Sequence, residues 1–124
     1  MSSYFCVRKG EQELISFSRS SYVYQAFQLP YTEKWKELEQ EDFVEAINEL
    51  NSKKEKYEKD IEMHKEALNG LSYEDKLICL RDIQDLKEEL EYIIQAKNWI
   101  VLLELIADEY DEKNQKQKVY YRIS

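Results

Sequence analysis

The stretch ALNGLSYED, residues 67 to 75, joins two long segments that both have helical patterning. Gly70 is typical of the end of a helix, because glycine accepts a left-handed backbone without strain. Ser72 is a good N-cap for a second helix, and Glu74 and Asp75 suit its first turn. Only two or three residues separate the segments, so we expect an antiparallel helical hairpin.

The segment before this turn carries apolar residues at alternating steps of four and three, which is the spacing of a heptad repeat. We expect a helix over residues 32–70, capped by Thr32. The only histidine, His64, is a polar member of its packing face, as is Lys54. The predicted packing face comprises Phe43, Ile47, Leu50, Lys54, Tyr57, Ile61, His64, Leu68 and Leu71.

The segment after the turn predicts a second helix over residues 72–113. Its stretch WIVLLELIA, residues 99–107, is apolar on nearly every side, which is typical of a helix buried on every side. We therefore expect 99–107 in the main core and the turn at Gly70 at the far tip of a projecting hairpin. The predicted packing face comprises Cys79, Ile83, Leu86, Leu90, Ile93, Lys97, Ile100 and Ala107.

Three short segments, 4–8, 13–18 and 118–124, are rich in aromatic and β-branched residues and predict strands. Gly10 lies in the turn KGEQ between the first two, which predicts a β-hairpin. Because an isolated hairpin is only marginally stable in water, we expect the third strand to join it in one antiparallel sheet.

Residues 20–29, SSYVYQAFQL, combine strand-favouring tyrosines with helix-favouring residues. We favour a short helix that is capped by Ser20 or Ser21 and ends before Pro30. The predicted fold class is α+β and mostly α, in a single domain over 1–124. It comprises a long antiparallel helical hairpin (32–70 and 72–113) and a small antiparallel β-sheet formed by the N- and C-terminal segments (1–31 and 117–124).

Charge and cysteine content narrow the choice of partner and compartment. The chain has 26 acidic against 18 basic residues and a net charge of −8. This balance disfavours direct binding to nucleic acid or to a membrane and suits a basic protein partner. Two cysteines, far apart in sequence, and no segment typical of a signal peptide or a membrane span indicate a cytoplasmic protein with free thiols.

Acidic residues are concentrated on two helical stretches. Residues 33–49 hold seven acids and two bases, whereas 53–66 hold five of each. Such rows either solvate a helix face or complement a basic surface, and a line of carboxylates is what a nucleic-acid-binding protein would accept in place of phosphates. The first acidic row comprises Glu41, Asp42, Glu45 and Glu49, and the second comprises Asp82, Asp85 and Glu89.

Several large apolar residues of the second helix fall outside its packing face. A two-helix hairpin covers only one side of each helix, so we expect some of these residues to pack in a homodimer, with the hairpins in a four-helix arrangement. The predicted oligomer interface comprises Ile78, Leu80, Ile94, Val101 and Leu105.

Tyrosines and basic residues such as Arg8 and Arg122 gather in the predicted sheet segments. Sheet packing explains such tyrosines, and a contact surface is the alternative. Aromatic residues on a sheet also stack nucleic-acid bases, although the net charge disfavours this.

The sequence contains no glycine-rich phosphate loop and no Cys/His metal-binding spacing. We therefore predict no catalytic residues, no metal site, no cofactor and no enzymatic activity. The leading hypothesis is a binding protein that uses its acidic helices against a basic partner. One form of it is a phage-type inhibitor that occludes a nucleic-acid-binding site, since the composition suits an AT-rich genome. The alternatives are a self-assembling scaffold oligomer built on the hairpin and a small enzyme with a site between subunits.

Overall fold

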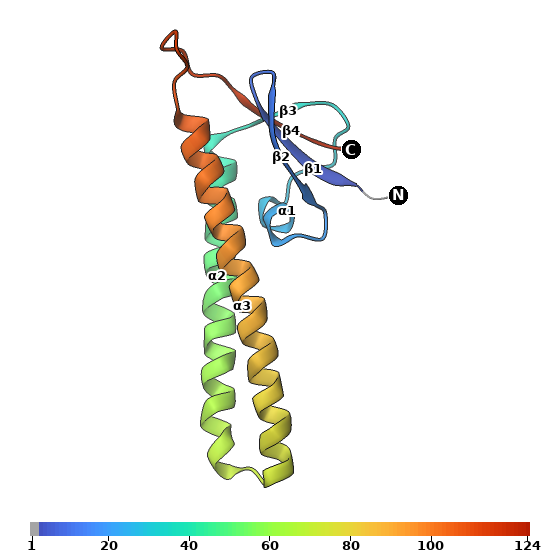
Figure 1. Ribbon diagram of the computed structural model, residues 1–124, viewed down its shortest axis with the longest axis vertical. Coiled ribbons are helices and arrows are strands. Elements are labelled where there is room, and N and C mark those ends of the chain that lie inside the picture. The colour runs from blue at the N-terminus through green and yellow to red at the C-terminus, as the bar shows by residue number, and fades with distance from the viewer. Residues whose placement is uncertain (1–2) are drawn as a thin grey trace.

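The computed structural model shows two long helices packed side by side, with a sheet and a short helix at one end (Figure 1). It describes residues 3–124, so residues 1 and 2 of the predicted sheet end lie outside the described residues. The predicted α+β class and the antiparallel hairpin are confirmed. In chain order the elements are β1 (Tyr4–Lys9), β2 (Gln12–Ser18), α1 (Tyr22–Phe27), β3 (Lys36–Leu38), α2 (Gln40–Ala67), the 3-10 helix η1 (Leu68–Gly70), α3 (Tyr73–Asp108) and β4 (Val119–Ile123).

The sheet is antiparallel throughout and has the strand order β2-β1-β4-β3. Gly10 makes the β1–β2 turn with a φ of 59°, as its position predicted. The C-terminal strand β4 lies between β1 and β3, so that Phe5 pairs with Ile123 and Val7 pairs with Tyr121. Strands from both ends of the chain therefore form the centre of the sheet.

One face of the sheet packs on α1 and on the adjacent end of the hairpin. The Phe5 ring lies 5.5 Å from the Phe27 ring of α1, and Phe27 lies 5.6 Å from Phe43 of α2, measured between centroids. Ser21 caps α1 by accepting a hydrogen bond from the backbone N–H of Tyr24, which confirms the short helix predicted here. The helix α1 thus connects the sheet to the hairpin.

The strand β3 was not predicted, and the predicted start of the first helix at Thr32 is wrong. The carbonyl oxygen of Thr32 accepts a hydrogen bond from the N–H of Ile123, and its hydroxyl caps only the local turn at Lys34. Residues 36–38 then form the strand β3, which pairs with β4. Pairing with a distant strand overrides the local helical preference, so α2 begins only at Gln40.

The turn at the hairpin tip also differs from the expectation. Gly70 does not adopt a positive φ, because residues 68–70 continue as the 3-10 helix η1. Ser72 caps α3 as predicted, with its hydroxyl oxygen 3.4 Å from the N–H of Asp75. Near this tip, the side chains of Ile61, Cys79 and Ile83 form a small buried cluster that is separate from the main core.

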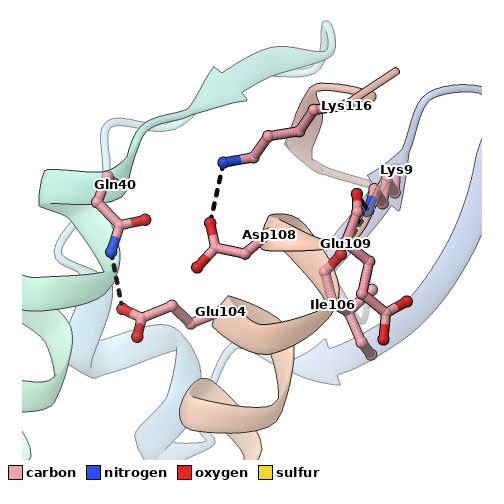
Figure 2. Close-up of polar contacts among 7 residues, drawn as sticks. All are labelled: Lys9, Gln40, Glu104, Ile106, Asp108, Glu109 and Lys116. Atoms are coloured by element: carbon pink, nitrogen blue, oxygen red, sulfur yellow. Dashed lines mark hydrogen bonds and ion pairs between the residues drawn. The ribbon is translucent and has the colours of Figure 1, made fainter. Parts of the chain in front are cut away.

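The helix α3 ends at Asp108, five residues before the predicted end at residue 113. Lys9 of β1 donates hydrogen bonds to the last carbonyl groups, those of Ile106 and Glu109, and thereby caps the helix (Figure 2). Beyond it, an Asp111 carboxylate oxygen accepts from the backbone N–H of Gln115 at 2.8 Å and fixes a turn. A cationic side chain at a helix C-terminus is electrostatically favourable.

Complete burial of residues 99–107 was predicted and is wrong. Ile100, Leu103 and Ala107 are buried, but Trp99, Val101, Leu102 and Leu105 are exposed. The sheet and α1 cover only part of α3, and α2 covers one further side. In the C-terminal half of α3 the packing face includes Ala96 and Leu103, which were not predicted. Lys97, which was predicted for this face, is only half-buried.

Candidate functional site

The first acidic row lies on α2, near the sheet end. Glu41 and Glu45 are exposed, and Glu49 is half-buried. Asp42 has a structural role, because its carboxylate accepts a hydrogen bond from the backbone N–H of Glu39 at 2.8 Å in a capping box. Glu41 and Glu45 are therefore the members of this row that face solvent freely.

The second acidic row lies on α3. Asp82 and Asp85 are exposed, whereas Glu89 accepts a hydrogen bond from the hydroxyl of Tyr22 in α1. This hydrogen bond, together with partial burial, raises the pKa of Tyr22. Glu89 thus helps to hold α1 against the hairpin. The free carboxylates of this row are those of Asp82 and Asp85.

The free carboxylates of the two rows lie at different levels of the hairpin. Since α2 and α3 run antiparallel from the turn at Gly70, the level of a residue is set by its distance from that turn. Glu45 lies about 25 residues from Gly70 and Asp85 about 15, so the rows are offset by about 15 Å along the hairpin.

The solvent-facing members of the acidic rows have no internal counter-charge. Five ion pairs occur among residues 3–124, and none of them includes a member of either row. Their negative charge is therefore available to solvent or to a partner.

A groove of about 490 Å³ adjoins the second acidic row, between α1, β2 and α3. Its walls combine polar side chains with four aromatic ones, Phe17, Tyr22, Tyr92 and Trp99, and the Phe17 ring lies 5.8 Å from that of Trp99. Glu89 lies in the same wall and is already bonded to Tyr22. No local pattern predicts this groove, because it forms only where segments about 70 residues apart meet.

The outer face of the sheet carries an aromatic and cationic cluster. The guanidinium groups of Arg8 and Arg122 lie 4.4 and 4.6 Å from the centre of the Trp35 ring. Arg8 also lies 5.1 Å from the ring of Tyr120. The two arginines were noticed from the sequence, but Trp35 was not, since only the pairing of β3 with β4 brings this ring to them.

The apolar residues predicted as an interface are exposed. Leu80, Ile94, Val101 and Leu105 share one side of α3, as their helical spacing requires, whereas Ile78 lies on a different side. They are available for contact with another molecule, and the homodimer itself stays a prediction.

The groups suited to metal binding or nucleophilic chemistry are dispersed. No cluster of three or more His, Cys, Asp or Glu side chains that could hold a metal ion occurs within residues 3–124. The Nδ1 atom of His64 lies 2.7 Å from the carbonyl oxygen of Asp60. Cys79 and Cys6 are free and buried. In the described part of the chain, no helix is both long enough and apolar enough to cross a bilayer.

Comparisons with protein-family models, with curated proteins and with solved structures find no match to this chain.

Proposed function

We propose that this protein is a non-catalytic binding protein whose acidic helical hairpin engages a basic surface of a protein partner in the cytoplasm. The observation that supports this function best is the set of exposed carboxylates without counter-charges, Glu41 and Glu45 on α2 and Asp82 and Asp85 on α3. Opposite charges on two surfaces accelerate their association and select the partner. Two buried, free thiols suit a reducing compartment.

The shape of the hairpin also supports this proposal. The helices α2 and α3 have 28 and 36 residues and project well beyond the sheet (Figure 1). A stiff rod with carboxylates at two levels can enter a cleft that normally holds a nucleic-acid strand. Inhibition of a nucleic-acid-binding protein, as by a phage-type antagonist, is therefore the specific form that we propose.

The experiment is a charge-reversal series in a capture assay. The variant E41K/E45K/E49K reverses the first acidic row, and its matched control E55K/E62K/E66K reverses three exposed acids elsewhere on α2. Tagged wild type and both variants are incubated with lysate of the source organism at low and at high salt. Bound proteins are then identified by mass spectrometry.

We expect wild type to retain a basic, nucleic-acid-binding protein that is released at high salt and displaced by added DNA or RNA. The first variant should lose this partner, and the control should keep it, with both variants folded by circular dichroism. Equal loss of the partner from both variants would show that binding depends on net charge alone, which would contradict a specific role for the first acidic row. Retention by the first variant would contradict the proposal.

A further inference from the structure

A second stripe of heptad spacing runs along α3, on a side that no other element covers. Starting at Tyr73, steps of four and three residues reach Leu105 without interruption. All ten positions are exposed, and the six large apolar members are exposed by 36 to 76%. The stripe comprises Tyr73, Leu77, Leu80, Gln84, Lys87, Glu91, Ile94, Asn98, Val101 and Leu105.

This stripe is distinct from the packing face that α3 turns toward α2. The buried residues Cys79, Ile83 and Ile93 belong to the packing face, and none of them is in the stripe. The helix α1 contacts α3 at Glu89, and Phe17 of β2 packs on Trp99. Both Glu89 and Trp99 also lie outside the stripe. A coiled-coil seam about 48 Å long, from Tyr73 to Leu105, is therefore left without a partner among residues 3–124.

The stripe is complementary to itself when it is reversed. Its two ends are mainly apolar, with Asn98 as the exception, and its centre holds one basic and one acidic residue, Lys87 and Glu91, beside the neutral Gln84. When a second copy is laid antiparallel about the midpoint, each Lys87 faces the Glu91 of the other copy. In the same register Leu77 faces Val101 and Tyr73 faces Leu105, whereas Leu80 faces Asn98 and Ile94 faces Gln84.

We propose that α3 pairs with α3 of a second copy as an antiparallel coiled coil in this register. A second copy is the occupant that this charge pattern fits, because reversal places each Lys87 against a Glu91. A parallel pair would instead place Lys87 against Lys87 and Glu91 against Glu91. The stripe residues occupy the a and d positions of a heptad. In the antiparallel register each a position faces a d position, as antiparallel coiled coils require. The sheet ends then lie at opposite ends of the dimer, where they do not collide.

This pairing does not depend on the proposed function. Four of the five residues predicted for an oligomer interface lie in the stripe, and Ile78 does not. The solvent-facing acids of both acidic rows lie outside it. Dimerisation and capture of a basic partner can therefore fail separately.

The first test uses charge exchange, read by sedimentation velocity over a range of concentrations. K87E alone places Glu opposite Glu, and E91K alone places Lys opposite Lys, so each variant should have a dimer Kd raised at least about tenfold. An equal mixture should form a heterodimer, because every central pair is then of opposite charge. The matched control D85K, with the same charge change as E91K, reverses an exposed acid outside the stripe and should remain dimeric.

The second test uses disulfide cross-linking between variants that each carry one added cysteine. L77C and V101C should each fail to cross-link alone. In the antiparallel register the new thiol of one copy lies far from the same thiol of the other copy. An equal mixture should form a covalent dimer under mild oxidation. Wild type shows whether the buried Cys6 and Cys79 contribute.

Specific results would overturn the proposal. A wild type that remains monomeric at every soluble concentration rules out the dimer. Cross-linking of L77C alone indicates a parallel pair. Failure of the charge-exchange mixture to associate, when both variants are folded by circular dichroism, rules out the central Lys87–Glu91 contact.

Discussion

Seventeen residues from three strands and all three α-helices form the buried core at the sheet end of the hairpin, whereas Ile61, Cys79 and Ile83 alone form the buried cluster near its tip. Both regions use the same two helices, but the sheet end adds a second and third layer over them (Figure 1). Because apolar burial is the main source of stability, the two regions should differ in the free energy of local opening.

The apolar side chains near the tip are numerous, so their exposure does not follow from a polar sequence. Tyr73, Leu77, Ile78 and Leu80 all lie in the first turns of α3 and are at least half exposed. Apolar patches that remain exposed on a folded chain often mark an interaction site. The tip therefore has many exposed apolar side chains over a small buried cluster, whereas the sheet end has a large buried core.

The largest effect is expected for Phe5→Ala at the sheet end. The Phe5 ring is fully buried and packs against Tyr24, Phe27 and Tyr121. Its removal should lower the free energy of unfolding by about 3–5 kcal/mol, as measured by urea denaturation. A loss below about 1 kcal/mol would show that this core does not dominate stability.

A smaller and more local effect is expected for Ile83→Ala near the tip. This substitution should cost about 2–3 kcal/mol, because it removes part of a cluster of three buried residues. Hydrogen exchange should accelerate over residues 61–90 and remain slow in β1 and β4. Equal acceleration in the sheet would show that both regions open as one cooperative unit, and the comparison would fail.

The smallest effect is expected for Tyr22→Phe, which removes the hydrogen bond from α1 to Glu89 of α3. The groove is open to solvent, so the loss should be about 1 kcal/mol at neutral pH. The raised pKa of Tyr22 adds a pH dependence. Its stabilising contribution is fully present below pH about 10, where the unfolded tyrosine ionises, and falls as the pH rises toward the folded pKa.

Wild type should therefore lose stability more steeply than Tyr22→Phe above pH about 10. Denaturant unfolding at several pH values measures this difference. Tyr121, whose pKa is raised mainly by burial, is present in both proteins and serves as the internal reference. Parallel pH profiles would show that the hydrogen bond to Glu89 does not stabilise the fold.

Local patterns in the sequence predicted the hairpin, because its determinants are local. The Ser72 cap, the heptad spacing and the two- to three-residue connection act over a few residues and leave one geometry for the two helices. The strand β3 was missed because Lys36, Glu37 and Leu38 have weak strand preference. They pair with β4, about 80 residues later, and such long-range contacts leave no local pattern.

The candidate site was predictable to a similar extent. The i, i+4 spacing placed Glu41 and Glu45 on one exposed face, as helical geometry requires. The engagement of Asp42 in a cap and of Glu89 with Tyr22 depends on the tertiary structure. The stacking of Arg8 and Arg122 on Trp35 depends on strand order and was invisible for the same reason.

The position of β4 between β1 and β3 has a consequence for the order of folding during synthesis. This strand is translated after both of the strands that it joins and after the whole hairpin. The helices α2 and α3 can therefore begin to pair before β4 is available, but the sheet cannot close until residues 119–123 have been synthesised. Until then Phe5 and Val7 lack the strand that pairs beside them, and such an unpaired apolar edge is prone to aggregation.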